Sequence, residues 1–436
     1  MDLQDKLIME DNRTYELYLG SAGIPLGQLN IQYNQNQINI LNFNYHDSWL
    51  KNPDNFPLSP DLPLINQKLS FFLNEEKPLP ACLLDLCPEQ WGRNLIDHYH
   101  ENKNEEINNP HLNQHDFDYL LHIPDFYRLG ALRIKPYQSA SEYLALLKNQ
   151  SNPQKLNFNQ LAQLIRSYEL KDNNITNFIQ ELTKIGTSLG GTRPKCTILD
   201  QDHQLWLAKF TSKNDILAVE KAEILTLRIA ELCNINVPEN RLINSEQPIA
   251  LTKRFDRFQN QRRHYLSAKS MLSHLPKFHP SYLDLVQAMK EICLDPQKDL
   301  KELFTRLTLY LLVSNTDDHF KNHGFLHIEK GKYELSPMFD VNPNPLAGPG
   351  LWHPIANTGH TTLEELLKQA NHFELTKDNA IHLINKTART INKNWRIVGQ
   401  DLGMTDQELE DYRLAFEHSE MDFALKLSNK NHRIVP

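Results

Sequence analysis

Asn315-Thr-Asp-Asp-His-Phe-Lys-Asn322 is a polar segment that directly follows residues 300–313, whose periodicity predicts an amphipathic helix. Two carboxylates, a histidine and an amide therefore gather where an apolar helix ends. Charged groups are costly to remove from water unless they bind a partner. We expect a functional site at this segment.

The spacing between this segment and the next acidic motif predicts a magnesium site. Asp317 and Asn322 stand five residues apart, and Asp340 follows 18 residues later, at the end of Ser336-Pro-Met-Phe-Asp340. Protein kinases use Asp-x-x-x-x-Asn in their catalytic loop, where the Asp accepts a hydroxyl proton and the Asn holds Mg²⁺. Mg²⁺ prefers such hard oxygen ligands. Each residue alone is also typical of a cap or a turn, but the three together favour a kinase.

The same segment permits a second interpretation. His319 and His323 are four residues apart, a spacing at which two histidines can share a metal ion. A metal-dependent hydrolase would use the following side chains: Asp317, Asp318, His319, His323 and Asp340. Such an enzyme would need neither a Gly-rich loop nor a strand lysine, and the sequence contains both.

A lysine on a predicted strand precedes two glutamates on a predicted helix. Lys209 lies in Leu205-Trp-Leu-Ala-Lys-Phe210, and Glu220 and Glu223 lie within residues 217–235. Kinases hold the α- and β-phosphates with a strand Lys and fix that Lys with a helix Glu. Taken alone, Lys209 is more typical of an exposed edge strand, and the glutamates of an exposed helix face.

A Gly-rich segment stands before this strand. In Gly186-Thr-Ser-Leu-Gly-Gly-Thr-Arg-Pro-Lys195, three glycines permit close backbone approach, and successive N–H groups can surround phosphates. The segment is neither a P-loop nor the kinase motif G-x-G-x-x-G. On its own it is more typical of a flexible turn.

The order of the predicted elements indicates an α+β, protein-kinase-like fold with two lobes and an additional N-terminal α+β subdomain. We assign residues 1–136 to the N-terminal subdomain, 137–256 to the β-rich N-lobe with Gly-rich loop and hinge, and 257–436 to the helical C-lobe. Three helical segments are expected after residue 362. Strands are expected at residues 15–19, 38–43, 197–199, 205–210 and 249–255.

Composition narrows the class of protein. The chain has 436 residues, enough for two or three domains, and a formal net charge of -8. An acidic chain is poorly suited to bind nucleic acid by itself. The five cysteines are widely spaced and form no C-x-x-C pair, which indicates reduced thiols in the cytoplasm. We expect neither a signal peptide nor a membrane span.

Taken together, the motifs resemble the HipA family of serine/threonine kinase toxins from type II toxin–antitoxin systems. The similarity covers most of the chain, and Asp-x-His-x-Lys-Asn is fairly specific to the family. The matching segments are Leu86-Cys-Pro-Glu-Gln-Trp-Gly-Arg93, Leu129-Gly-Ala-Leu-Arg133, Gly186–Lys195, Leu207-Ala-Lys209, Leu251-Thr-Lys-Arg-Phe-Asp-Arg257, Asn315–Asn322 and Leu335-Ser-Pro-Met-Phe-Asp340.

The resemblance implies a role for each matching residue. Asp317 would be the catalytic base, and Asn322 and Asp340 would hold Mg²⁺. Ser188 would be autophosphorylated, which would displace the Gly-rich loop and switch the kinase off. The residues implied to contact ATP are Gly186, Ser188, Leu189, Gly190, Gly191, Lys195, Lys209, Glu223, Lys253, Phe255 and His319.

The resemblance also implies partners. A small helix-turn-helix antitoxin of the HipB kind would bind the chain and bring it to DNA indirectly, and the protein substrate could be an aminoacyl-tRNA synthetase. Lys253 stands at a hinge position that often holds Glu, which is tolerable if only backbone groups contact adenine. The alternative within the family is a catalytically weak nucleotide-binding co-repressor that acts with its antitoxin on DNA.

Overall fold

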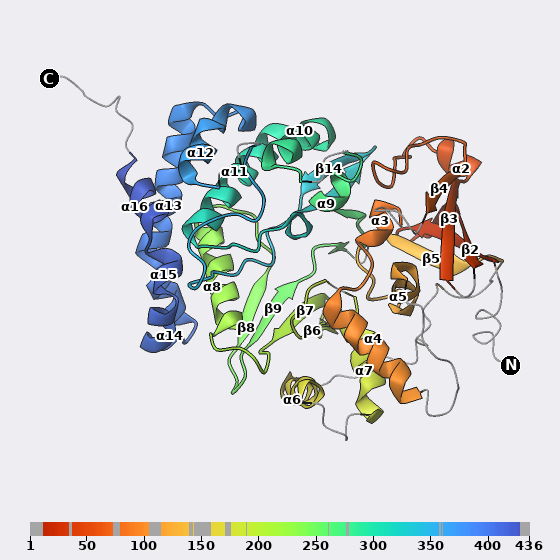
Figure 1. The fold of residues 1–436 in the computed structure, drawn as a ribbon, viewed down its shortest axis with the longest axis horizontal. Coiled ribbons are helices and arrows are strands. Elements are labelled where there is room, and N and C mark those ends of the chain that lie inside the picture. The colour runs from red at the N-terminus through yellow and green to blue at the C-terminus, as the bar shows by residue number, and fades with distance from the viewer. Residues whose placement is uncertain are drawn as a thin grey trace. The chain divides into compact units, whose positions relative to one another are not determined.

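The computed structural model divides the chain into two compact units (Figure 1). The first contains residues 1–213, 254–266 and 326–331, and the second contains residues 214–253, 267–325 and 332–436. The residues that the structure describes are 12–34, 37–72, 79–103, 115–138, 143, 158–170, 176–188, 190–259, 261–275, 279–356, 359 and 361–427.

The first unit combines antiparallel strands with helices. Its elements are β1 (Asn12–Leu19), β2 (Ile24–Asn34), β3 (Gln37–Tyr45), α2 (Asp47–Leu50), β4 (Leu69–Phe72), α3 (Ala81–Leu84), α4 (Gln90–Lys103), α5 (Asp116–His122), β5 (Leu132–Pro136), α6 (Phe158–Glu169), α7 (Thr176–Gly186), β6 (Lys195–Leu199), β7 (Leu205–Phe210), β10 (Arg257–Phe258) and β11 (Gln261–Arg262). The chain passes between the units within β12 (Tyr265–Ser267) and β13 (Gly324–Glu329).

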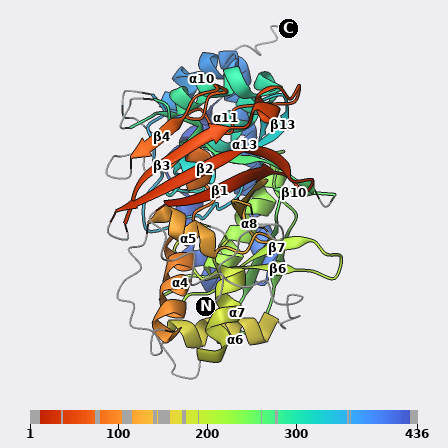
Figure 2. The ribbon, with the colours of Figure 1, turned by 90° about the vertical axis from the view of Figure 1, so that its right-hand side faces the viewer.

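A five-stranded antiparallel sheet forms the N-terminal part of this unit. Its strands follow the order β4-β3-β2-β1-β5, and Figure 2 shows the first four side by side. Tyr15 and Leu17 on β1, and Leu41 and Phe43 on β3, are buried on alternate positions. This period of two is the pattern from which both strands were predicted, and both predictions are confirmed.

A hairpin of β6 and β7 carries Lys209. Two hydrogen bonds of Asp200 stabilise the turn between the strands. Its N–H donates to the Gln204 carbonyl at 3.0 Å, and its carboxylate accepts the Trp206 indole N–H at 2.7 Å. Helix α7 packs on β6 and on α4, and Figure 1 shows α4 and α7 side by side. The Gly-rich segment therefore starts from a packed helix and ends in a strand.

A buried ion cluster explains the acidic residue of the 251–257 motif. The Asp256 carboxylate is fully buried and accepts hydrogen bonds from the Arg254 guanidinium at 2.9 and 2.6 Å, from Arg257 at 2.5 Å and from the Gly130 N–H at 2.7 Å. Burial alone would raise the pKa of Asp256, but the two guanidinium groups outweigh burial and hold this pKa well below its usual range. The cluster ties residues 254–257 to residue 130.

Asp256→Ala should destabilise the protein by about 3–5 kcal/mol, because it leaves two partly or fully buried arginines without their shared carboxylate. The contribution of Asp256 is present above its unfolded pKa of about 3.9 and is lost as the pH falls through the lower, folded pKa. Urea unfolding at neutral pH measures the change. Glu364→Gln, at an exposed pair with Lys368, is the control and should leave the midpoint unchanged. An equally small change in both variants would contradict the structural role of the cluster.

The second unit is mainly helical. Its elements are α8 (Val219–Leu232), β8 (Asn240–Ile243), β9 (Ile249–Lys253), α9 (Ala268–Met271), α10 (Tyr282–Ile292), α11 (Pro296–Leu312), η2 (Phe320–Asn322), β14 (Lys332–Leu335), α12 (Leu363–Lys368), η3 (Ala370–Phe373), α13 (Lys377–Asp401), α14 (Asp406–Asp411), α15 (Arg413–Phe416) and α16 (Ser419–Lys426). Strands β8 and β9 pair antiparallel.

Helix α11 is the centre of this unit. The sequence pattern predicted an amphipathic helix here. Every residue from Leu303 to Leu312 is buried, however, so this part of the helix has no exposed face. The difference arises because α10, α12, α13 and α16 all pack on α11. Helix α13 also packs on α8 and α16, as Figure 1 shows.

Other boundaries differ slightly from the sequence prediction. The helix expected at residues 217–235 runs from Val219 to Leu232, and the strand expected at residues 249–255 ends at Lys253. Between residues 362 and 427, the described part of this region, the chain forms five α-helices and one short 3₁₀ helix in place of three helical segments. Within the described part of the chain, no helix has the length and apolar character needed to cross a bilayer.

Candidate active site

The segment after α11 forms a compact loop that exposes Asp317. Ser314 has a left-handed backbone with φ 51°, and the Asn315 N–H donates to the Tyr310 carbonyl at 2.9 Å, so the chain turns sharply out of the helix. Asn322 closes the loop, because its Nδ2 donates to the Asp317 carbonyl at 2.9 Å. This bond uses the amide nitrogen and leaves Oδ1 of the carboxamide to act as an acceptor or metal ligand.

Asp340 is tied to this loop through neighbouring amides. The Asn342 N–H donates to Asn315 Oδ1 at 2.9 Å, and the Asn344 N–H donates to the Ser314 carbonyl at 3.1 Å. Asp340 itself has φ 55°, a conformation that non-glycine residues adopt rarely and that occurs often at functional sites. The structure thus brings together the segments that carry Asp317, Asn322 and Asp340, as their spacing predicts.

The available oxygens fit a magnesium ion. Mg²⁺ is usually held by one or two carboxylates together with substrate phosphates and water. The half-buried Asp340 carboxylate and the Asn322 carboxamide oxygen are ligands of this kind.

The alternative metal-hydrolase site is not formed. All five of its proposed residues belong to the described part of the chain, and within that part no three His, Cys, Asp or Glu side chains are grouped to hold a metal ion. His323 is fully buried, and its Nε2 lies 3.2 Å from the Tyr282 hydroxyl. His319 instead precedes η2 as its N-cap residue. The two histidines therefore do not form the predicted alternative pair.

Asp318 is a residue that the sequence analysis assigned only to the alternative metal-hydrolase site, and the structure gives it another role. Its buried carboxylate accepts the Trp352 N–H at 2.6 Å and the Tyr282 hydroxyl. Burial raises the pKa of Asp318 to about 6, although both hydrogen bonds act in the opposite direction. The partners are 34 and 36 residues away in the sequence, so no local pattern identifies them.

In the first unit, Lys209 faces a second lysine. Lys209 on β7 pairs directly with Lys195 on β6, and the side chains are only 7% and 4% exposed. Directly opposed residues of an antiparallel pair share one face of the sheet, and like charges there repel each other. Two buried lysines beside a Gly-rich segment are therefore suited to a polyanion. The alternative of an exposed edge-strand lysine is wrong.

The Gly-rich segment is held by residues before and in α4. The Gly191 N–H donates to the Glu89 carboxylate, the Trp91 N–H donates to the Gly191 carbonyl at 3.1 Å, and the Trp91 indole donates to the Lys195 carbonyl at 2.8 Å. Gly191 has φ 103°, and a Cβ at this position would collide with Lys195 Nζ. Lys195 Nζ donates to the Gly190 carbonyl. The amide of Gly191 thus already accommodates an anionic group.

Ser188 is buried next to this segment. Its side chain is 4% exposed, and its Oγ lies 2.8 Å from Thr197 Oγ1 on β6. The Ser188 hydroxyl is therefore hydrogen-bonded to another side chain. Leu189, also predicted to contact nucleotide, lies outside the described residues.

The remaining predicted residues have defined surroundings. Glu220 and Glu223 are 3% and 2% exposed, so the alternative of an exposed helix face is wrong for both. Lys253 ends β9, and its Nζ lies 3.5 Å from the Glu239 carboxylate. Phe255 is half-buried in the first unit, 6.4 Å from Tyr265 between ring centroids.

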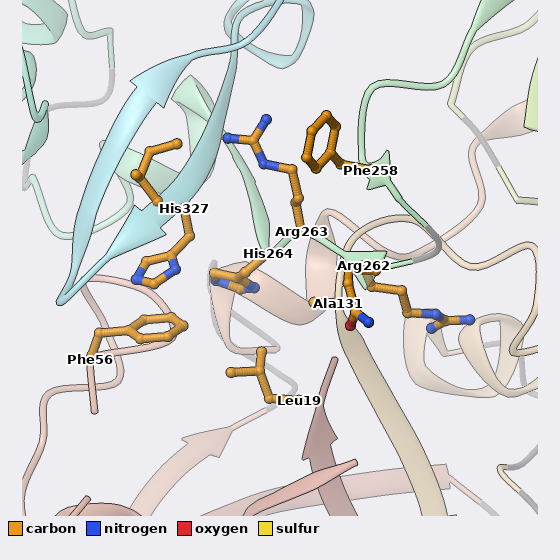
Figure 3. A pocket seen from close by; sticks show the side chains of 10 residues that line it. Leu19, Phe56, Ala131, Phe258, Arg262, Arg263, His264 and His327 are labelled. Carbon is orange, nitrogen blue, oxygen red and sulfur yellow. The ribbon is translucent and has the colours of Figure 1, made fainter. Parts of the chain in front are cut away.

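The first unit also contains a pocket of about 460 Å³ (Figure 3). The ring of His327 stacks on Phe56 with 3.7 Å between centroids, and the His264 side chain lies 2.9 Å from the Leu58 carbonyl. Burial lowers the pKa of His264 to about 4 and the pKa of His327 to about 3, so both are neutral at pH 7. No predicted site residue in the described part of the chain lines this pocket.

A comparison with solved structures shows which fold the chain has. The structure is similar to HipA of Shewanella oneidensis MR-1, in a toxin–antitoxin complex with HipB and its operator DNA, with a TM-score of 0.62 and 16% sequence identity. The similarity covers 94% of this chain and 96% of that HipA. The predicted α+β fold is therefore confirmed.

Two family models identify the family itself. Residues 21–133 match the HipA N-terminal domain, and residues 187–395 match the HipA-like C-terminal domain. The chain belongs to the HipA family. A Haemophilus influenzae protein named "Putative kinase" is 23% identical over 187 residues, which are 37% of this chain and 54% of that protein. The match thus spans about half the length of this curated relative.

Proposed function

We propose that this chain is an ATP- and Mg²⁺-dependent serine/threonine protein kinase of the HipA kind. The observation that carries the proposal is the loop closed by the Asn322–Asp317 hydrogen bond and joined to the Asp340 segment through Asn315 and Asn342. This arrangement supplies an exposed carboxylate beside two oxygen ligands for a metal ion. A protein that only binds DNA with a partner has no need of such a set.

Each group of the loop has a proposed role. The exposed Asp317 carboxylate accepts the proton of the substrate hydroxyl as that oxygen attacks the γ-phosphorus. Asn322 and Asp340 hold Mg²⁺, which, when bound, neutralises charge on the phosphates. His319, within the loop, contacts nucleotide. The hydroxyl oxygen forms the new bond to phosphorus, the bond to the β–γ bridging oxygen breaks, and ADP leaves.

The phosphate groups of ATP fit the basic face of the β6–β7 hairpin. Lys195 and Lys209 offer two buried positive charges, and Gly190 and Gly191 allow close backbone approach. A phosphate that takes the Gly191 N–H replaces the Glu89 carboxylate there. Glu223 is the proposed partner of Lys209, and Lys253 and Phe255 belong to the segment that contacts adenine through backbone groups.

The proposal extends to location and partners. We place the protein in the cytoplasm, with a HipB-like helix-turn-helix antitoxin as its partner and DNA contacted through that antitoxin. The support is the fold shared with a HipA bound to HipB and operator DNA. The proposed substrate is a protein serine or threonine, with an aminoacyl-tRNA synthetase as the family precedent.

ADP formation from ATP tests this function. The purified chain should release ADP when Mg²⁺ is present, and EDTA should stop the release. Lys209→Met should lower the rate strongly, because the long apolar side chain keeps the shape but removes the charge. Release that is equal in wild type and Lys209→Met, or that persists in EDTA, would contradict the proposal.

Ser188 should acquire phosphate when the protein is incubated with Mg²⁺ and ATP. A phosphate group carries about -1.5 to -2 charges at neutral pH, and the buried site beside Thr197 has no room for it without movement of the segment. Such a group also repels the phosphates of ATP. Mass spectrometry should find the modified peptide, and the phosphorylated form should bind ATP much more weakly than the unmodified form.

The matched control for Ser188 is Thr192, an exposed hydroxyl in the same segment. Ser188→Ala should abolish the modified peptide and keep ATP turnover going for longer, whereas Thr192→Val should do neither. Self-inhibition is wrong if the phosphorylated form binds ATP normally, or if other proteins are phosphorylated while Ser188 stays unmodified.

A further inference from the structure

Asp318 connects three segments of the second unit that lie far apart in the sequence. It precedes η2 in the loop, and its carboxylate bonds to Trp352 in the chain beyond Asp340 and to Tyr282, the first residue of α10. Asp318 is 1% exposed, while Asp317 next to it is exposed. The two adjacent carboxylates therefore occupy different environments, one buried and one accessible.

Further hydrogen bonds complete this connection. The Tyr282 hydroxyl also contacts the Asp318 carbonyl at 2.9 Å, so it binds the backbone and the side chain of the same residue. The N–H groups of Tyr282 and Leu283 donate to the carbonyls of Pro354 and Ile355 at 3.0 and 3.1 Å. The segment 352–355 is thus fixed both to α10 and to the loop.

We propose that Asp318 is a positioning residue for phosphate transfer. It anchors the loop to segment 352–355 and to α10, and it thereby fixes the direction in which the Asp317 carboxylate faces the substrate hydroxyl. This inference rests on the proposed kinase function.

The cost of burying Asp318 supports a role beyond stability. A buried carboxylate is expensive, and a well-packed apolar residue in its place is often neutral or stabilising. What an apolar residue cannot do is accept two directed hydrogen bonds from separate segments. The Trp352 side chain is 62% exposed, so the bond to its N–H does not serve to bury the indole in the core.

The expected consequence is a loss of rate and not of nucleotide binding. A misplacement of about 1 Å at a reacting group can lower a rate by about 10²-fold. Asp317 touches the attacking hydroxyl, whereas all the proposed ATP contacts except His319 lie outside this loop. Asp318→Asn, which keeps an acceptor for the Trp352 N–H but loses the charge, should lower kcat by about 10-fold, and Asp318→Ala by about 100-fold. The KM for ATP should stay unchanged in both.

ADP release from Mg²⁺–ATP measures kcat and KM in wild type and in both Asp318 variants. Tyr282→Phe removes only the hydroxyl donor and should also lower kcat. It replaces Asp318→Ala as the test if that variant does not fold. Glu365→Gln is the matched control. Glu365 lies on α12, its carboxylate is also buried in this unit, and it accepts a hydrogen bond from Gln369 Nε2 at 2.9 Å. This control should lower the melting temperature without changing kcat.

Deuterium uptake provides a readout that is independent of catalysis. The peptide that contains the Trp352 amide should exchange faster in Asp318→Ala than in wild type or in Glu365→Gln. Faster exchange together with a lower kcat and an unchanged KM supports the proposal. The proposal is overturned if the Asp318 variants of an active enzyme keep the wild-type kcat. It is also overturned if Glu365→Gln, at a similar loss of melting temperature, lowers kcat by the same factor. Absence of ADP release in wild type overturns the proposed function itself, and this role of Asp318 with it.

Discussion

Asp317→Ala should lower the rate of phosphate transfer from ATP by about 10²–10⁴-fold, the usual contribution of a general acid or base. The residue is exposed and lies outside regular secondary structure, so its side chain does little for the core. The Asn322 hydrogen bond that closes the loop ends on the Asp317 backbone carbonyl, which alanine retains. The melting temperature should therefore change little while activity is lost.

The matched control for this variant is Asp378→Ala. Asp378 is also exposed and lies in the first turn of α13, outside the site. Transfer should continue at the wild-type rate in this control. An Asp317→Ala protein that keeps wild-type phosphorylation, with the same melting temperature, would refute the assignment of Asp317 as the catalytic base.

Asp340→Asn should remove most of the stabilisation that Mg²⁺–ATP gives to the protein. A ligand that binds only the folded state adds about 2.7 kcal/mol when its concentration is 100 times Kd, so the wild-type melting temperature should rise clearly. Asparagine adopts the left-handed conformation at φ 55° readily, so the backbone is retained. The variant loses only the negative charge that would bind the metal ion.

Melts with ATP in EDTA are the control for Asp340→Asn. Without Mg²⁺ the shift on adding ATP should be small in both proteins, and with Mg²⁺ it should be large in wild type alone. Equal shifts in wild type and variant with Mg²⁺ present would show that Asp340 does not hold the metal.

The sequence predicted those parts of the fold that depend on local periodicity. Strands β1 and β3 follow an alternating apolar pattern, β6 and β7 are apolar runs on either side of a polar turn, and helix α8 follows a spacing of three to four residues. The Asp-x-x-x-x-Asn spacing was also informative, because the hydrogen bond from Asn322 to Asp317 closes the loop within six residues. The domain boundaries at residues 136 and 256 stay predictions.

The rest depends on contacts between distant residues. Whether Lys209 and Glu223 are exposed or buried cannot be read from their neighbours, because the packing partners of their strand and helix decide it. The opposition of Lys195 and Lys209 requires the register of the hairpin. Asp318 meets Tyr282 and Trp352 only after α10 and the loop have folded together, and no sequence period connects them.

The most direct test of the kinase assignment follows the γ-phosphate itself. The wild-type chain is incubated with Mg²⁺ and ATP labelled on the γ-phosphate, alone and with a candidate aminoacyl-tRNA synthetase, and the proteins are hydrolysed to amino acids. We predict label on phosphoserine or phosphothreonine, with none in Asp317→Ala. The assignment would be contradicted if the wild-type chain left the labelled ATP intact. It would also be contradicted if the label appeared only as inorganic phosphate and Asp317→Ala released the same amount.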